Sequence, residues 1–313
     1  MTWQKIGKIY SPKGNMPWSK THASVPIPYY LSKDLFRVYF STRDNLNRNS
    51  LGYVEFDINN PREILKISSK PAFSFGKLGH FDCDGVYGTC IIKHNKNIRL
   101  YYAGWNAGIR GTFYSSIGLA ISKDNGKTFQ RYSESPILQR DNIDKWAVMA
   151  PFVSKIDKNM WHMWYSSGIT LDYKNINKNQ IKSKYDVKLA ISKNGINWIK
   201  TGLTSFKLGK KDTNIARVCV LKNKDQFEAW YPYVNLSSKK YQIGYAKSKN
   251  GKNFTRLDKN IFSRLLISKK ANQWDSKSVT YPYVFIHNNK YYMLYNGNEF
   301  GKTGFGLAIW KNH

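Results

Sequence analysis

The sequence predicts an all-β protein, a five-bladed β-propeller whose blades are four-stranded and antiparallel. Three observations support this prediction: a segment that recurs five times at intervals of 61 to 68 residues, an aromatic strand pattern after each copy, and repeated Asn-Gly turns. Aromatic residues make up 15% of the 313 residues, which favours strands. A repeat of about sixty residues that holds four short strands is typical of a propeller blade.

Each unit begins with a short run of small, apolar and β-branched residues, which we expect to form the innermost strand. The five copies are residues 24–30, 85–91, 147–153, 215–221 and 278–284. The second strand of each unit is rich in aromatic residues and is expected at 36–40, 98–102, 161–165, 227–231 and 291–295. The third strand is expected at 51–54, 117–120, 187–190, 243–246 and 305–308.

A turn and an aromatic fourth strand follow the third strand in three units. These segments are 122–129, 192–198 and 248–254, and each contains an Asn-Gly pair, which suits a tight turn that requires positive φ. The last unit stops at its third strand, so residues 3–10 are expected to supply its fourth strand and close the ring. The prediction is one domain over residues 1–313.

One alternative changes the number of blades. Residues 122–129 match the S-x-D-x-G-x-T-[WF] turn of sialidase propellers, which have six blades. Five copies counted directly along the chain favour five.

Charge and cysteine content restrict the partners and the compartment. The 50 Lys and Arg against 20 Asp and Glu give a net charge of +30, but only 11 of the basic residues are Arg and they form no cluster. We therefore expect no specific nucleic-acid partner. Three cysteines without a CxxC pair, a polar N-terminal segment and the lack of a long apolar run favour a cytoplasmic protein without a transmembrane segment, a metal site or a cofactor.

Comparing equivalent positions of the five units separates scaffold from candidate site. An aspartate stands three residues before the first strand in four units, which favours a turn-forming role, and Asp82 and Asp275 are the two kept as site candidates. At the position one residue before the first strand, no residue type recurs. The five units have Ala23, Asp84, Trp146, Asn214 and Lys277 there. Such variety is expected of a ring that faces a ligand.

Two further positions add candidates. The third residue of the first strand is Arg217 in one unit and Tyr87 in another, and an arginine on a channel wall suits a carboxylate or phosphate. At the position four residues beyond the second strand, the five units have Asp44, Asn106, Ile169, Asn235 and Glu299. Arg43, His22 and Trp105 lie next to these positions or to the first strands.

The segments 274–276, 281–284, 295–298 and 301–306 resemble the five-bladed propellers of the arabinanase, xylosidase and invertase superfamily. The whole chain looks most similar to glycosidase-like propellers encoded among bacterial surface-polysaccharide genes. Enzymes of that superfamily use three carboxylates on the inner strands of three blades. Asp84 matches one of these positions, whereas the other two blades offer His22, Ala23, Ser24, Trp146 and Met149.

The resemblance implies a carbohydrate-active enzyme, a glycosidase or a related transferase or phosphorylase, acting on a saccharide or sugar nucleotide in surface-glycan metabolism. The catalytic pair is expected to be Asp84 and Asp44. The substrate-binding residues are expected to be His22, Arg43, Asp82, Tyr87, Trp105, Asn106, Trp146, Arg217, Asp275, Lys277 and Glu299, with the basic ones holding an acidic or phosphate group. The alternative is a glycan-binding or scaffolding propeller without turnover.

Overall fold

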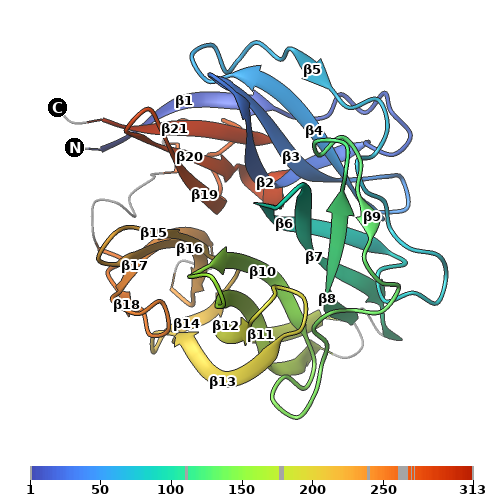
Figure 1. Ribbon diagram of the computed structural model, residues 1–313, viewed down its shortest axis with the longest axis vertical. Coiled ribbons are helices and arrows are strands. Elements are labelled where there is room, and N and C mark those ends of the chain that lie inside the picture. The colour runs from blue at the N-terminus through green and yellow to red at the C-terminus, as the bar shows by residue number, and fades with distance from the viewer. Residues whose placement is uncertain are drawn as a thin grey trace.

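The computed structural model describes residues 2–109, 112–175, 180–237, 240–259, 267–268, 270 and 272–311. Over these residues the protein is built from strands, with one short helical turn, α1 (Asn298–Gly301), as Figure 1 shows. The described part of the chain contains no helix that is long and apolar enough to cross a membrane.

The strands fall into five consecutive antiparallel groups. The first group contains β2 (Thr21–Ser32), β3 (Leu35–Arg43), β4 (Asn49–Asp57) and β5 (Lys66–Ile67). The second contains β6 (Gly85–His94), β7 (Asn97–Ala107), β8 (Phe113–Ser122) and β9 (Gln130–Arg131). The third contains β10 (Val148–Lys155), β11 (Trp161–Asn175), β12 (Gln180–Ser192) and β13 (Ile199–Phe206).

In the fourth group the first strand is interrupted. This group contains β14 (Asp212–Ile215), β15 (Cys219–Lys222), β16 (Phe227–Asn235), β17 (Tyr241–Ser248) and β18 (Thr255–Arg256). The fifth contains β19 (Thr280–His287), β20 (Lys290–Asn296) and β21 (Phe305–Lys311), and its outer neighbour is β1 (Thr2–Tyr10), which pairs with β21. The fourth strands β9, β13 and β18 begin directly after the segments 122–129, 192–198 and 248–254, so these segments form the turns and not the strands.

The first strands of the groups lie around a common centre. β2 contacts β6 and β19, β6 contacts β10, and β15 contacts β10 and β19. Figure 1 shows β2, β6, β10 and β19 nearest the middle of the molecule, with the later strands of each group outside them. The hydrophobic clusters combine side chains from different groups, so the core lies between groups as well as within them.

Side chains link neighbouring first strands at the centre. The thiol of Cys90 donates to the carbonyl of Val153 and accepts from its N–H, both at 3.4 Å. Cys219 makes the same two contacts with Val284 at 3.4 and 3.2 Å. Burial raises the pKa of both thiols to about 12, so both remain S–H donors at neutral pH.

The predicted Asn-Gly turns also join neighbouring groups. The glycine carbonyl of each turn accepts a hydrogen bond from the second strand of the preceding group. The three bonds run from the Tyr39 hydroxyl to Gly126 at 2.6 Å, from the Tyr101 hydroxyl to Gly195 at 2.8 Å, and from the Trp164 indole to Gly251 at 2.9 Å. All three glycines have positive φ, which explains why this residue type recurs there.

The repeated aspartates anchor the outermost strand in four of the five groups. Each carboxylate pairs with a basic residue on the fourth strand or, in the fifth group, on β1. The pairs are Asp82 with Arg131 at 2.7 Å, Asp144 with Lys200 at 2.7 Å, Asp212 with Arg256 at 2.5 Å, and Asp275 with Lys5 at 2.5 Å. Asp82 and Asp275 are therefore buried in scaffold ion pairs.

Asp144 illustrates how much such an anchor contributes to stability. Its buried carboxylate also accepts from Lys188, Tyr165 and Ser167. Burial on its own raises the pKa of Asp144, but hydrogen bonds from Lys200, Ser167 and Lys188 outweigh burial and hold the pKa below its usual value.

We expect Asp144→Asn to lower the free energy of unfolding by about 3–5 kcal/mol at pH 7, because it removes the buried carboxylate that pairs with Lys188 and, together with Asp141, with Lys200. The folded-state pKa is depressed, so this stabilisation is complete above pH ~4 and disappears as the pH falls through the folded-state pKa. Urea unfolding against pH measures the difference. Asp225→Asn, in an exposed turn, is the control. A deficit for Asp144→Asn that stays constant down to low pH contradicts the account.

Candidate functional site

A central cavity of about 650 Å³ lies at the end of the molecule where the first strands begin. All five groups contribute to its wall. The first strands supply Ser24, Val25, Tyr87, Thr89, Met149, Ala150 and Tyr281, and the segment between β14 and β15 supplies Arg217. Because every group supplies part of the wall, the arrangement of the groups fixes the shape of the cavity.

Arg217 is the most unusual side chain of this wall. It is fully buried, and its Nη2 donates to the carbonyl of Tyr281 at 2.7 Å, while Nε and Nη1 have no hydrogen-bond partner. The guanidinium lies 5.1 Å from the centre of the Tyr283 ring. Burial lowers the pKa of Arg217, yet a guanidinium stays charged in proteins. A buried cation with two unused donors is costly unless an anion completes it.

A second arginine faces the same space. Arg43 stands at the end of β3, and its Nη2 donates to the hydroxyl of Tyr87 at 3.1 Å, whereas its Nε is buried without a partner. Both arginines act on the hydroxyl of Tyr281: burial raises the pKa of this hydroxyl, and the charges of Arg217 and Arg43 oppose that rise. The two positive charges therefore converge near Tyr281.

No carboxylate balances these charges. All 20 Asp and Glu residues belong to the part of the chain that the structure describes, and none of them lines the cavity. Throughout the described ranges, no group of three or more His, Cys, Asp or Glu side chains is placed to hold a metal ion. The cavity is therefore suited to an anion.

His22 lies beside the cavity and responds to the same positive field. Its Nδ1 is 2.9 Å from the hydroxyl of Thr21. Burial, together with the charges of Arg43 and Lys302, lowers the pKa of His22 to about 4. The imidazole is therefore neutral at pH 7, which adds hydrogen-bonding capacity without another charge.

Aromatic and hydroxyl groups complete the wall. Trp105 and Phe113 line one side, and Trp146 packs against Phe113 with ring centres 5.8 Å apart. Two further lining residues, Tyr185 and Tyr241, have their hydroxyls 2.5 Å apart. Aromatic faces next to hydroxyl groups can hold the apolar faces and the hydroxyls of a sugar ring.

The backbone of the wall is strained at three matching places. Val25, Ala150 and Tyr281 have φ of 54°, 50° and 49°, and each stands immediately before a proline. Positive φ is unfavourable for these residue types, and a following proline favours extended backbone. The register of the three first strands breaks at these residues. Strain of this kind gathers at functional sites.

Of the residues predicted from the sequence, the structure brings Arg43, Tyr87, Trp105 and Arg217 together in the cavity wall. The predicted catalytic pair does not lie there. Asp44 accepts from the N–H groups of Leu46 and Arg48 and from the Arg48 side chain, so it closes the turn after β3.

Asp84 stands just before β6 and accepts from the N–H of Ala107 at 2.7 Å, outside the lining residues. Lys277 and Glu299 are exposed, and Glu299 pairs with Lys302 at 3.2 Å. Asn106 lies on β7 opposite Tyr114.

The sequence reasoning missed Tyr185, Tyr241 and Tyr281. Tyr185 and Tyr241 each stand two residues before the predicted third strand, where the other units have Asn49, Ser115 and Thr303. This is another position where the side chains differ and stay polar, and Ser115 also lines the cavity. The same comparison of repeat units, applied two residues before each predicted third strand, finds Tyr185 and Tyr241 but not Tyr281, which lies on β19.

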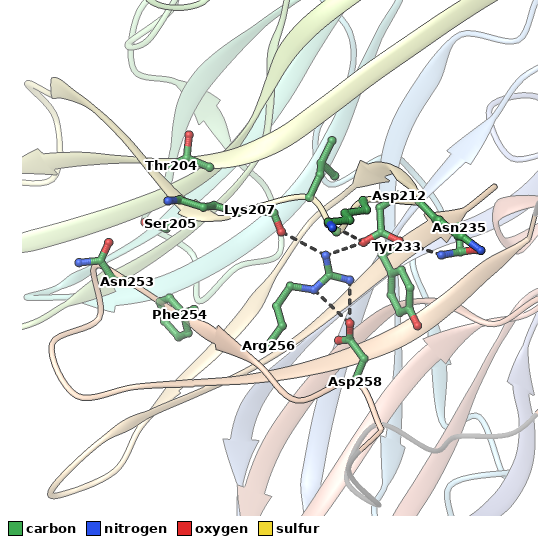
Figure 2. Close-up of a pocket in the computed structure, with 14 residues that line it drawn as sticks. Thr204, Ser205, Lys207, Asp212, Tyr233, Asn235, Asn253, Phe254, Arg256 and Asp258 are labelled. Carbon is green, nitrogen blue, oxygen red and sulfur yellow. Dashed lines mark hydrogen bonds and ion pairs between the residues drawn. The ribbon is translucent and has the colours of Figure 1, made fainter. Parts of the chain in front are cut away.

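A second hollow, of about 860 Å³, lies outside the centre near β13, β14 and β18. Figure 2 shows Arg256 at its wall between two carboxylates, Asp212 at 2.5 Å and Asp258 at 2.7 Å. Burial lowers the pKa of Arg256, but Tyr231 and these carboxylates outweigh burial and raise it. Its charge is neutralised by the protein, in contrast to that of Arg217.

Sequence comparison shows which proteins the chain is related to. No protein-family model matches it. It is 33% identical over 313 residues to two uncharacterised proteins of Mycobacterium tuberculosis, MT1551 of strain CDC 1551 and Rv1502 of strain H37Rv, with 100% of each chain covered. The chain belongs to the family of these two proteins.

Solved structures show which fold this family has. A glycoside hydrolase has a TM-score of 0.76 at 17% identity, covering 100% of this chain and 92% of that one. A glycosyl hydrolase from Bacteroides ovatus has a TM-score of 0.71 at 15% identity, covering 99% of this chain and 94% of that one. A third structure comes from work on GH130 mannoside phosphorylases and on glycoside hydrolases that target β-1,2 mannosidic linkages. It has a TM-score of 0.70 at 16% identity, and the match covers 99% of this chain and 93% of that one. The family of MT1551 and Rv1502 therefore has an all-β, propeller-like fold.

The charge field of the cavity can be measured at His22. We expect the pKa of His22 to be about 4 and to rise in Arg43→Met, because the substitution removes a neighbouring positive charge. A histidine NMR titration reads this directly. Arg62→Met, an exposed change elsewhere, is the control and should leave the pKa of His22 unchanged. An equal pKa for His22 in the wild type and Arg43→Met contradicts the arrangement.

Proposed function

We propose that this protein is carbohydrate-active and binds a saccharide that carries a phosphate or carboxylate group in the central cavity. One observation carries the proposal: Arg217 is fully buried in the cavity wall with two unused donors, and no carboxylate lines the cavity. A planar guanidinium with free donors matches the oxygens of a phosphate or carboxylate. A sugar nucleotide or a phosphorylated sugar supplies such a group.

The remaining wall and the fold support a saccharide as the rest of the ligand. Trp105, Phe113 and the tyrosine hydroxyls offer stacking faces and hydrogen bonds. The solved structures with a similar fold include proteins named as glycoside hydrolases. On the same basis we infer one five-bladed propeller over residues 1–313, closed by β1. The five strand groups, the contacts among first strands and the pairing of β1 with β21 support it.

For the reaction we propose glycosyl transfer or phosphorolysis, in the cytoplasm and in surface-glycan metabolism. Both reactions use an anionic co-substrate, which the cavity suits, and neither requires the two facing carboxylates that hydrolysis of a glycosidic bond uses. Asp84, although outside the lining residues, stays the predicted acid and is tested below, whereas Asp44 is held within its own turn and is not carried into the proposal. A glycan-binding protein without turnover is the second candidate, favoured by the lack of carboxylates among the lining residues.

Arg217→Met separates a binding role from a structural role. The substitution removes a buried charge that no protein group neutralises, so we expect it to leave the free energy of unfolding unchanged or to raise it. It should also weaken binding of anionic saccharides by about tenfold or more, the value of a hydrogen bond to a charged group. Thermal-shift screening of sugar nucleotides, sugar phosphates, uronic acids and neutral sugars against both proteins measures binding, and urea unfolding measures stability.

Arg256→Met is the matched control, because it removes a buried arginine that two carboxylates neutralise. It should lower the free energy of unfolding by about 3–5 kcal/mol. If Arg217→Met is destabilised as much as Arg256→Met, then Arg217 is a structural residue and the proposal is wrong.

Turnover is tested separately by mass spectrometry, with the same ligands, with and without inorganic phosphate. Product that disappears in Asp84→Asn supports an enzyme that uses Asp84. Product that persists in Asp84→Asn removes Asp84 from the chemistry. Saturable binding without any product supports the glycan-binding protein.

A further inference from the structure

Exposed apolar side chains surround the end of the molecule where the cavity opens. The described residues of the connections between second and third strands, together with one residue within β11, include five exposed large apolar side chains at this end. They are Leu46, Ile109, Ile169, Leu236 and Phe300. Two loops that lead into first strands at the same end add Leu78, which is 96% exposed, and Ile143. We name these seven residues the mouth rim.

The opposite end of the molecule also has exposed apolar side chains, among them Tyr30, Leu65, Ile199 and Ile286, but none is more than 68% exposed, whereas Leu46, Leu78 and Ile109 are 71%, 96% and 80% exposed. The turns between first and second strands occupy 33–34, 95–96, 156–160, 223–226 and 288–289. Within the described chain, none of these turns has an exposed large apolar side chain, and their tips are Lys, Asn and Asp residues. An apolar set of this kind on one face marks a surface that contacts something other than water.

Basic residues stand beside the mouth rim. Lys77 precedes Leu78, Lys145 follows Ile143 by two residues, and the carbonyl of Lys211 accepts from the N–H of Leu236 at 2.8 Å. Exposed lysines at this end are Lys77, Lys145, Lys182, Lys210, Lys211 and Lys277.

The acidic residues at this end cancel little of that charge. Asp44 and Glu299 are paired with Arg48 and Lys302, and Asp141 is paired with Lys200. Asp172 is exposed on β11, and Glu134, which is 78% exposed, lies 4.0 Å from His80 near Leu78. Positive charge is therefore in excess around the apolar tips.

We propose that the mouth rim docks on the surface of an anionic lipid bilayer, with the central cavity opening toward the lipid headgroups. Separate apolar tips with lysines between them match an interface in which side chains enter the acyl boundary and cations meet anionic headgroups. A nucleic acid would attract the lysines but would leave the apolar tips in water, so the tips favour the bilayer. In this orientation the cavity faces saccharides joined through phosphate to a lipid, an extension that rests on the proposed function.

Vesicle flotation tests the docking. Wild-type protein should bind vesicles of mixed phosphatidylcholine and phosphatidylglycerol, bind pure phosphatidylcholine more weakly, and lose affinity as salt is added. The triple variant Leu46→Ser, Leu78→Ser, Ile109→Ser should bind the anionic vesicles about tenfold more weakly or worse. All three side chains are at least 71% exposed, so the variant should fold.

The matched control changes the same number of exposed apolar residues away from the mouth rim, in Leu65→Ser, Ile67→Ser, Ile199→Ser. It should bind as the wild type does. Equal losses in both triple variants, or no loss in the mouth-rim variant, overturn the proposal. A duplex DNA oligonucleotide that loses as much affinity as the vesicles for the mouth-rim variant also overturns it. The mouth-rim variant should still bind soluble anionic saccharides as the wild type does, so failure of the docking and failure of the proposed function are distinguishable.

Discussion

The buried charge of Arg217 is the constraint on which the interpretation of this structure depends. A guanidinium without solvent, with one hydrogen bond to a carbonyl and one aromatic ring beside it, is unfavourable in a folded protein. The same chain shows how a buried arginine is normally accommodated, since Arg256 sits between Asp212 and Asp258. The difference between the two sites is the missing counter-ion, and a ligand can supply it.

The scaffold around Arg217 is built to tolerate this cost. The aspartates that anchor the outer strands, the glycine carbonyls that accept bonds from the next group, and the buried thiols at the centre all join segments far apart in the sequence. Such a frame can hold the positive φ of Val25, Ala150 and Tyr281 at the cavity wall. Stability gained between the groups offsets strain and unbalanced charge at the centre.

Much of the strand arrangement followed from the sequence because it repeats. The segments expected for the second and third strands lie within observed strands, and β1 pairs where residues 3–10 were expected to add a strand. Comparing equivalent positions singled out Arg217 and Tyr87, and adjacency to Asn106 singled out Trp105; all three line the cavity. The aspartates before the first strands were expected to be structural because they recur, and Asp144 and Asp212 are buried in ion pairs.

The predicted carboxylates show the limit of that comparison. Position in a repeat does not reveal whether a side chain is already satisfied locally, and Asp44 is held by the N–H groups of its own turn. The sequence also does not show which backbone conformation a residue before a proline adopts. The placement of Tyr281 in the cavity wall could therefore not be predicted. The charge balance of the cavity is a sum over five groups, and only the folded chain brings Arg43 and Arg217 to the same space.

One crystallographic measurement tests the central claim directly. Crystals of the wild-type protein grown with selenate, a phosphate-like anion, would be measured at the selenium absorption edge. The account predicts an anomalous peak inside the cavity, within hydrogen-bonding distance of the free donors of Arg217 and on the side that faces Arg43. Selenate only at surface lysines, with both free donors of Arg217 bonded to protein groups, would contradict it.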